Sequence, residues 1–217
     1  YNCGTSYVFI ITGVFVYIIG IAGGSGSGKT TFAHKVQERI NDKDSVILSM
    51  DSYYLNELPE NIKTAKGNLN FDHPHAFDWE LLNLHISELK KGNDICVPVY
   101  DFKTNSRDEE IVTFSPNKIV LFEGIFSLFD KDIRSLLDIK CFLHVDSDIR
   151  FTRRLHRDVN DRGRSLESVI NQYYETVRPM YQKYLEPQKQ FADFTVGEET
   201  DVAADILTAR IRELLNE

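Results

Sequence analysis

The chain has 217 residues, a length that suggests one domain, or one domain with a sizeable insertion. Its composition, 42% hydrophobic and 27% charged with 6 Pro and 12 Gly, excludes a disordered, collagenous or low-complexity protein. The net charge of −8 argues against nucleic acid as a partner, because non-specific binding needs a surplus of cationic side chains. Three widely spaced cysteines indicate neither a disulfide framework nor a zinc cluster, and they fit a reducing cytoplasm.

The N-terminal stretch is apolar: no charged residue precedes Lys29, and Tyr7 to Ala22 are almost wholly hydrophobic. A membrane-spanning helix needs about 20 apolar residues, whereas this run is shorter and is interrupted by glycine and threonine. We therefore expect no membrane attachment. Because β-branched and aromatic residues dominate, we predict a buried strand at Tyr17–Ala22 and leave Tyr1–Val16 as a separate apolar segment with no assigned role.

Strand and helix patterns alternate along the rest of the chain. Strands are predicted at Ser45–Met50, Lys118–Glu123, Ile139–Asp146 and Phe194–Val196, and helices at Thr30–Ile40, Asp78–Lys91, Ser147–Asn160, Leu166–Leu185 and Val202–Leu215. This alternation predicts an α/β fold with a parallel sheet flanked by helices. Two long connections interrupt the alternation: a polar segment at Leu55–Phe77, and short strands around a turn at Ile95–Phe114. We interpret both as insertions that face a substrate.

A glycine-rich motif directly follows the first predicted strand. The residues Gly23-Gly24-Ser25-Gly26-Ser27-Gly28-Lys29-Thr30 match G-x-x-x-x-G-K-[ST], between a strand and a helix, which is the context of a phosphate-binding loop rather than of a flexible Gly/Ser turn. Loop N–H groups and the helix N-terminus bind phosphate oxygens. We expect Lys29 to reach the β- and γ-phosphates, Thr30 to ligate Mg²⁺, and Thr31 to complete the nucleotide-binding set.

Two acidic residues stand where strands end. Asp51 follows the second strand, at the carboxyl edge where open α/β sheets bind ligands. It fits a general base that accepts the proton of an acceptor hydroxyl, and it fits equally a helix cap or a ligand of Mg²⁺-bound water. Glu123 ends the strand predicted at Lys118–Glu123, and we expect it to ligate Mg²⁺ directly or through water.

Half of the twelve arginines of this acidic chain lie between residues 150 and 164. They are Arg150, Arg153, Arg154, Arg157, Arg162 and Arg164. Such a stripe on a helix is compatible with an ordinary solvated face. The Asp-Arg-Gly-Arg turn that follows the helix favours instead a helical lid over polyphosphate at about residues 150–165, with only some of the arginines reaching phosphate.

Together these motifs resemble the uridine kinase (uridine-cytidine kinase) family. The resemblance runs from about Ile18 to Gly197 and also includes Asp51-Ser52-Tyr53-Tyr54, Asn70 to Asp78, Pro98-Val99-Tyr100-Asp101-Phe102, Leu121 to Ile125, and Arg157-Asp158 through Arg164. It implies a P-loop NTPase-type domain at residues 17–217 with a β-rich substrate-binding insertion at about 95–114. It further implies transfer of a phosphoryl group from ATP or GTP, with Mg²⁺, to the 5′-hydroxyl of a pyrimidine nucleoside, by a cytoplasmic homotetramer in pyrimidine salvage.

The resemblance also implies roles for individual residues. Asp51 matches the catalytic base, and Asp72 matches the carboxylate that binds the ribose hydroxyls. Further matches are to the nucleoside pocket (Tyr54, Phe71, Tyr100, Phe102, Arg154 and Gln172) and to the catalytic lid (Arg157, Arg162 and Arg164). A carboxylate suits a vicinal diol, because it accepts two hydrogen bonds and leaves an acceptor unpaired with deoxyribose. For any one of the aromatic residues, ordinary core packing is the alternative.

Asn105 departs from the family pattern, which commonly has histidine at this position for reading the pyrimidine edge. An amide both donates and accepts, so Asn105 suits either uracil or cytosine, and the sequence leaves this preference open. His73, His75 and His156 lack metal-ligand spacing and are interpreted as surface or turn residues. Two alternatives to a nucleoside kinase remain: a phosphoribulokinase- or pantothenate-kinase-like enzyme, and a regulatory protein that binds nucleotide without transferring phosphate.

Overall fold

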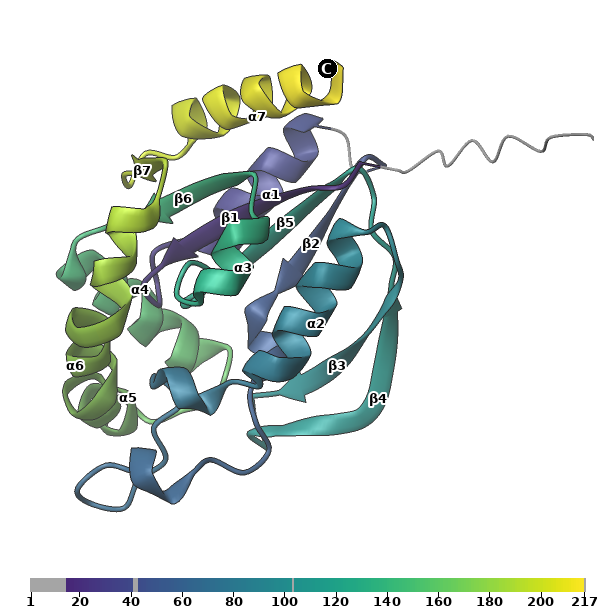
Figure 1. Ribbon diagram of the computed structural model, residues 1–217. Coiled ribbons are helices and arrows are strands. Elements are labelled where there is room, and N and C mark those ends of the chain that lie inside the picture. The colour runs from purple at the N-terminus through teal and green to yellow at the C-terminus, as the bar shows by residue number, and fades with distance from the viewer. Residues whose placement is uncertain (1–14, 41–42, 103, 217) are drawn as a thin grey trace, which may run out of the picture.

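A five-stranded parallel sheet forms the centre of the computed structural model, which describes residues 15–40, 43–102 and 104–216. Its strands are β1 (Tyr17–Gly23), β2 (Ser45–Ser49), β5 (Ile119–Gly124), β6 (Ile139–Leu143) and β7 (Phe194–Val196), in the order β2-β5-β1-β6-β7 (Figure 1). Each neighbouring pair is parallel, so the carboxyl ends meet at one edge, as predicted. Apart from its last two residues, the apolar segment Tyr1–Val16 lies outside the described residues.

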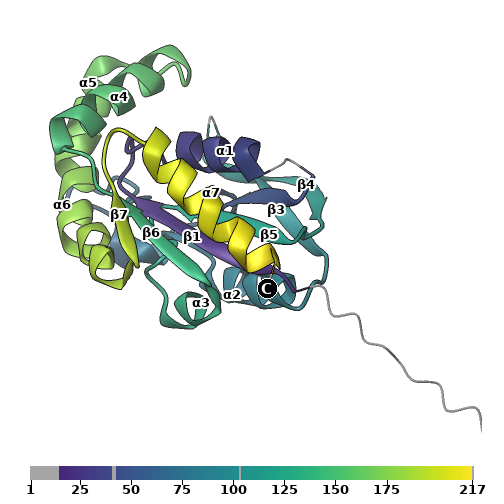
Figure 2. The ribbon, with the colours of Figure 1, turned by 90° about the horizontal axis from the view of Figure 1, so that it is seen from above.

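Helices cover both faces of the sheet, which explains the continuous apolar runs of its central strands. On one face, Ile19 and Ile21 of β1 share a core with α1 (Lys29–Ile40) and α7 (Asp201–Asn216). On the other face, Ile18 and Ala22 share a core with α2 (Trp79–Lys90) and α3 (Lys131–Leu136) (Figure 2). Within the described ranges, no helix has the length and apolar character needed to cross a bilayer.

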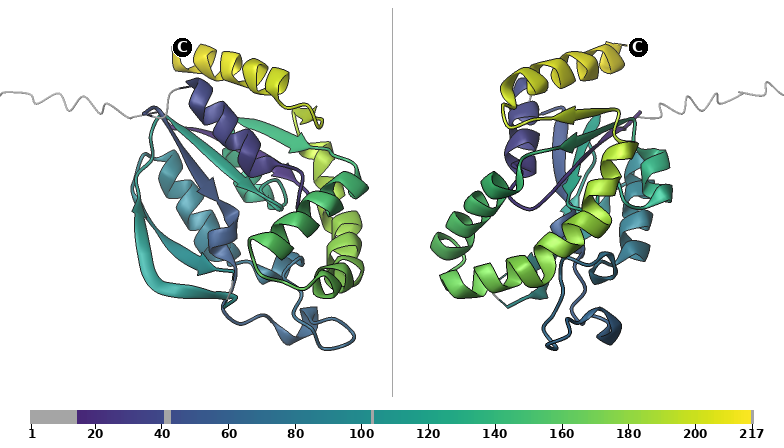
Figure 3. Two further views of the ribbon diagram at one scale, coloured as in Figure 1. Left: turned by 180° about the vertical axis from the view of Figure 1, so that it is seen from behind. Right: turned by 90° about the vertical axis from the view of Figure 1, so that its left-hand side faces the viewer.

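A long helical arm follows β6. Helix α4 (Ser147–Asn160) leads into a turn at Gly163, whose φ of 66° favours glycine, and then into α5 (Leu166–Gln172). The arm continues through π-helical turns at 173–177 and 181–185 on either side of α6 (Arg178–Met180) (Figure 3). The sequence predicted one helix over this stretch. The helical course is confirmed, but its winding changes twice, and such π-helical turns often mark functional sites.

An antiparallel hairpin of β3 (Ile95–Asp101) and β4 (Ser106–Phe114) occupies the predicted β-rich insertion. Arg107 of this hairpin donates hydrogen bonds to the carbonyls of Tyr53 and Tyr54 at 3.3 and 2.9 Å. Its guanidinium also pairs with Asp78 at 3.1 Å. One arginine therefore joins the hairpin to the segment that carries Asp51.

Strand β6 and helix α3 depart from the sequence prediction. Strand β6 ends at Leu143 rather than at Asp146, because Asp146 already lies at the N-cap of α4. Helix α3 was not predicted, since six residues are too few to produce a recognisable period. It begins at Asp130, whose carboxylate accepts hydrogen bonds from the backbone N–H groups of Asp132 and Ile133 at 2.9 and 3.0 Å.

The packing of α7 on the sheet predicts unequal effects of two neighbouring substitutions. Leu207 is 1% exposed within the core beneath α7, whereas Ile206 is 63% exposed. Leu207→Ala removes buried methyl groups and leaves a cavity, so we expect it to lower the free energy of unfolding by about 2–5 kcal/mol. Ile206→Ala is the matched control and should change it by less than about 0.5 kcal/mol. Urea unfolding measures both, and equal effects would contradict this packing.

Candidate functional site

A cavity of about 670 Å³ lies at the carboxyl edge of the sheet, bounded by the phosphate loop, the segment after β2, the hairpin and the helical arm. All the residues predicted to bind nucleoside line it: Asp51, Tyr54, Phe71, Asp72, Tyr100, Phe102, Asn105, Arg154 and Gln172. Ser25, Gly26, Lys29, Thr30, Glu123, Arg157, Arg162 and Arg164 line it as well. Of the predicted nucleotide-binding set, Gly23, Gly24, Ser27, Gly28 and Thr31 do not line the cavity. One cavity thus contains both predicted halves of the site.

The phosphate loop has the backbone conformation that its glycines allow. Gly26 and Gly28 have φ values of 79° and 89°, in the left-handed region that other residues rarely adopt. The loop closes with a hydrogen bond from Ser27 N to Gly24 O at 3.1 Å. The buried Lys29 donates from Nζ to the same carbonyl at 3.2 Å. Burial lowers the pKa of Lys29, whereas the neighbouring Glu123 and Asp51 carboxylates raise it.

Oxygen donors converge beside the loop. Thr30 Oγ1 and Ser49 Oγ each donate to Glu123 Oε1 at 3.1 Å. Burial raises the pKa of Glu123, and these hydroxyls together with Lys29 oppose that rise. A carboxylate and hydroxyls are the hard oxygen ligands that suit Mg²⁺, so the residues fit the predicted metal. Within the described residues, no group of three or more His, Cys, Asp or Glu side chains is arranged to hold a metal ion.

Asp51 lies on a 3₁₀ turn, Met50–Tyr53, directly after β2. The cap of this turn is Ser49, whose hydroxyl accepts a hydrogen bond from Asp51 N at 3.3 Å, so the Asp51 side chain is not the cap. Burial raises the pKa of Asp51, while Lys29, Arg162 and Arg157 oppose the rise. A carboxylate with a raised pKa in a cationic cavity has the electrostatic character of a general base.

Aromatic rings form the wall on the hairpin side of the cavity. The Tyr54 ring lies 5.8 Å from Phe71 and 5.1 Å from Tyr100, and Tyr100 lies 5.3 Å from Phe102. Tyr54 is 8% exposed and belongs to the hydrophobic core, whereas Phe102 is 38% exposed. Core packing and cavity lining are therefore compatible for Tyr54, Phe71 and Tyr100, whereas Phe102 lines the cavity without belonging to the core.

Asp72 directly follows Phe71 and also lines the cavity. Its side chain is largely buried, and its Oδ2 accepts a hydrogen bond from Thr176 Oγ1 at 2.8 Å. Thr176 lies in the first π-helical turn of the arm, so the altered winding brings its hydroxyl to Asp72. Among the described residues no other hydrogen-bond donor to Asp72 is seen, so Oδ1 and the remaining lone pair of Oδ2 can accept hydrogen bonds from a ligand.

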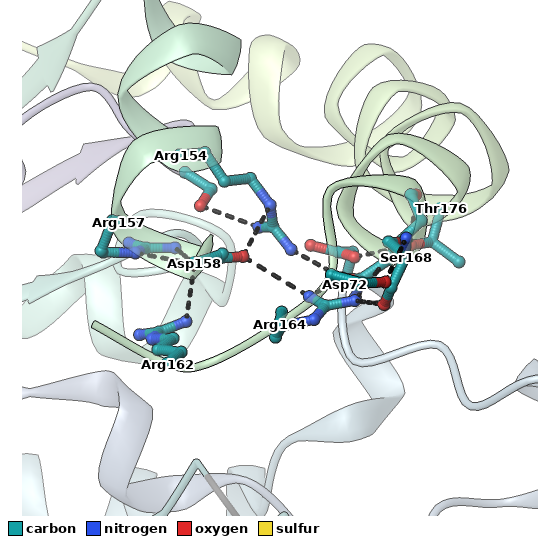
Figure 4. Close-up of polar contacts among 11 residues, drawn as sticks. Asp72, Arg154, Arg157, Asp158, Arg162, Arg164, Ser168 and Thr176 are labelled. Carbon is teal, nitrogen blue, oxygen red and sulfur yellow. Dashed lines mark hydrogen bonds and ion pairs between the residues drawn. The ribbon is translucent and has the colours of Figure 1, made fainter. Parts of the chain in front are cut away.

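Four of the six clustered arginines surround one buried carboxylate, Asp158 (Figure 4). They are Arg154, Arg157, Arg162 and Arg164, and all four line the cavity. Arg150 and Arg153 do not line it: Arg150 stacks on the Tyr181 ring at 3.8 Å, and Arg153 pairs with Glu198 at 2.6 Å. The expectation that only some of the arginines face the ligand site agrees with this arrangement. No role was predicted for Asp158 from the sequence.

Gln172 and the arm connect the arginines to the nucleoside side. The Gln172 side-chain oxygen accepts hydrogen bonds from Arg154 and Arg164. Arg162 stacks on the Phe102 ring at 4.2 Å. Sequence analysis missed further cavity-lining residues on the arm: Ser168, Asn171, Glu175 and Thr176. Ser168, Glu175 and Thr176 lie three or four residues from Gln172, and Asn171 lies three residues after Ser168. This spacing was the available signal, since residues three or four apart are neighbours on a helix surface.

Asn105 is exposed at the hairpin turn, where its φ of 54° is the single positive value among the described non-glycine residues. Asparagine and histidine both tolerate this backbone conformation better than most residues. The turn therefore supplies a backbone reason for the residue type, in addition to any contact with a base. His156 is exposed and His73 caps a 3₁₀ turn, in agreement with their predicted surface and turn positions.

The parallel sheet, the loop between β1 and α1, and the acidic and arginine side chains at the sheet edge define an α/β P-loop fold of the kinase type. A model of the phosphoribulokinase/uridine kinase family matches residues 18–204. The chain therefore belongs to this family.

Known relatives match over nearly their full length. A uridine kinase from Lactobacillus helveticus is 48% identical over 203 residues, which cover 92% of this chain and 96% of the relative. A uridine kinase from Clostridium novyi is 43% identical over 206 residues, covering 92% and 97%.

Solved structures show the same fold at lower identity. A possible uridine kinase from Bacillus stearothermophilus is similar with a TM-score of 0.58, 22% identity and coverage of 83% of this chain and 88% of that chain. The phosphoribulokinase from Rhodobacter spheroides is similar with a TM-score of 0.60, 15% identity and coverage of 85% and 70%.

The raised pKa of Asp51 predicts a pH-dependent cost to folding. Between the ordinary pKa of 3.8 and the raised one, the folded protein binds more protons than the unfolded chain, so rising pH lowers the free energy of unfolding. The Asn side chain does not titrate, so the Asp51→Asn variant does not lose stability in this way. The variant should therefore gain stability over the wild type as pH rises from 4 through the raised pKa, and the difference should then level off. Urea unfolding across this range measures the stability difference, and a difference that does not shift in favour of the variant as pH rises would contradict the prediction.

Proposed function

We propose that this protein is a uridine kinase, which transfers the γ-phosphoryl group of ATP or GTP to the 5′-hydroxyl of uridine or cytidine. The observation that carries the proposal is the single cavity that contains the phosphate loop, Asp51 and Asp72. The uridine kinases from Lactobacillus helveticus and Clostridium novyi support it, because they match the chain over nearly their whole length.

In this proposal the nucleotide lies along the phosphate loop, with Lys29 and the lid arginines against its terminal phosphates. These cations stabilise charge that develops on the transferring phosphoryl group, inside a cavity where such interactions are stronger than in water. Thr30 and Glu123 would hold Mg²⁺. When bound, Mg²⁺ supplies neutralisation of phosphate charge.

The nucleoside occupies the other half of the cavity. Asp72 accepts hydrogen bonds from the 2′- and 3′-hydroxyls of ribose, while the aromatic wall contacts the base. Asp51 receives the proton of the 5′-hydroxyl as the oxygen attacks the phosphoryl group. Gln172 turns its amide oxygen toward two arginines, so its amide N–H groups are available to the nucleoside.

The proposal extends to the whole described fold. Residues 17–217 act as one kinase domain, in which residues 95–114 form the substrate-binding insertion and about 150–165 form the lid. The family resemblance supports action in cytoplasmic pyrimidine salvage as a homotetramer.

An acceptor panel tests the proposed reaction. ADP release from MgATP should depend on uridine or cytidine, and should stay at background with deoxycytidine, adenosine, pantothenate or no acceptor. Asp51→Asn serves as the catalytic control: it should keep nucleotide affinity and lose about 10²–10⁴-fold in turnover. Turnover with pantothenate alone, or nucleotide binding without any acceptor-dependent release, would refute the uridine kinase proposal.

The proposed contact with ribose predicts that substitution of Asp72 weakens uridine binding more than substitution of Thr176. Asp72→Ala removes hydrogen bonds to a charged group, each of which typically contributes about 1.5–3 kcal/mol. The Kd for uridine should therefore rise about 10–100-fold. Thr176→Val keeps the Asp72 carboxylate and the shape of the side chain but removes the hydroxyl that donates to Asp72. One such hydrogen bond contributes about 1 kcal/mol, so uridine binding should weaken by less than tenfold. Calorimetry with uridine and with MgATP separates the two ligands. Unchanged uridine affinity in Asp72→Ala would exclude Asp72 from the ribose site.

A further inference from the structure

Asp158 is a charged group beside the cavity that the proposed reaction does not use. Its side chain is fully buried, at 0% exposure, on the last turn of α4. The nearest cation, Arg157, donates from Nη2 at 2.8 Å. Arg154, Arg162 and Arg164 each approach to 3.4 Å, so four guanidinium groups share one carboxylate (Figure 4).

The local backbone brings these arginines together. Arg154 and Arg162 lie four residues before and after Asp158, and α4 ends between Asp158 and Arg162. The turn at Gly163 then returns the chain, and Arg164 N donates to the Asp158 carbonyl at 3.0 Å. Asp158 thus holds both the helix end and the turn, through its backbone and its side chain.

The charges in this region would repel one another without a buried anion. Burial and neighbouring arginines lower the pKa of Arg162 and Arg164, and Asp158 opposes that lowering in both. Removing one partner of a buried ion pair leaves the other charges uncompensated. Four guanidinium groups that face one cavity therefore need a compensating charge before an anionic ligand arrives.

We propose that Asp158 is a positioning residue that holds Arg154 and the three lid arginines in place at the cavity before the nucleoside triphosphate binds. A guanidinium has five N–H donors, so pairing with Asp158 leaves donors on each arginine for phosphate oxygens. Donors held in advance need no reorganisation when charge develops on the transferring group. This inference rests on the proposed phosphoryl-transfer function.

Neutralising Asp158 should lower turnover without weakening nucleotide binding. Asp158→Asn keeps the shape of the side chain and removes one negative charge beside the phosphate site, which favours an anionic nucleotide. The same change releases the arginines from their arrangement, which weakens stabilisation of the transition state. A purely structural role predicts a different result, in which nucleotide affinity and turnover fall together.

The experiment compares Asp158→Asn with Asp161→Asn, an identical chemical change at an exposed residue that makes none of these four ion pairs. Calorimetry with a non-hydrolysable MgATP analogue gives Kd, and ADP release with uridine gives kcat. For Asp158→Asn we expect kcat to fall about 100-fold, comparable to losing one preorganised donor. Its Kd for the analogue at low salt should be equal to or below that of the wild type. Asp161→Asn should match the wild type in both. A raised Kd in Asp158→Asn, or unchanged kcat, would overturn the proposal.

Limited trypsin digestion of the wild type tests the same arrangement without a variant that must fold. At low salt, cleavage after Arg162 or Arg164 should be at least about tenfold slower than after the exposed Lys66, because the ion pairs oppose local opening. Salt at 1 M should reduce that difference by screening. Equal cleavage rates at low salt would overturn the proposal. A wild type that binds the analogue, resists cleavage and leaves uridine unphosphorylated would refute the uridine kinase function alone.

Discussion

The parallel pairing of β1 with β5 is the constraint on which the site depends. In this register Ile21 faces Glu123 and Ala22 faces Gly124, so the phosphate loop begins where β5 ends. The pairing of β2 with β5 brings Ser49 beside Glu123 in the same way. Because parallel strands end at the same edge, the loop, the acidic residues and the hydroxyls converge there.

Charge balance governs the chemistry of this edge. Lys29 and four arginines meet Asp51, Asp72, Glu123 and the buried Asp158 around one cavity. Burial alone disfavours each charge, so the pKa values of the Asp51 and Glu123 carboxyls rise and that of Lys29 falls, while the opposite charges limit these shifts. This balance makes a locally cationic phosphate site compatible with an acidic chain.

The helical arm joins the two halves of the cavity. Gln172 at the end of α5 accepts hydrogen bonds from Arg154 and Arg164. The first π-helical turn carries Thr176, whose hydroxyl donates to Asp72. The stacking of Arg162 on Phe102 adds a contact from the lid to the hairpin. The groups proposed to bind phosphate and those proposed to bind the nucleoside thus lie on shared elements.

The sequence by itself determined the α/β class, the strand positions and the phosphate loop, because these follow from local periodicity and from a contiguous motif. It also identified Asp51, Glu123 and the lid arginines, which stand at strand ends or in one cluster. Tertiary structure alone decided which arginines face the cavity, and it assigned Arg150 and Arg153 to other contacts. It also revealed Asp158 and Thr176, whose partners are set by how α4, a Gly163 turn and a π-helical turn fold together in space. Sequence spacing describes neighbours along one helix, whereas the partners of a buried polar group depend on every element packed against it.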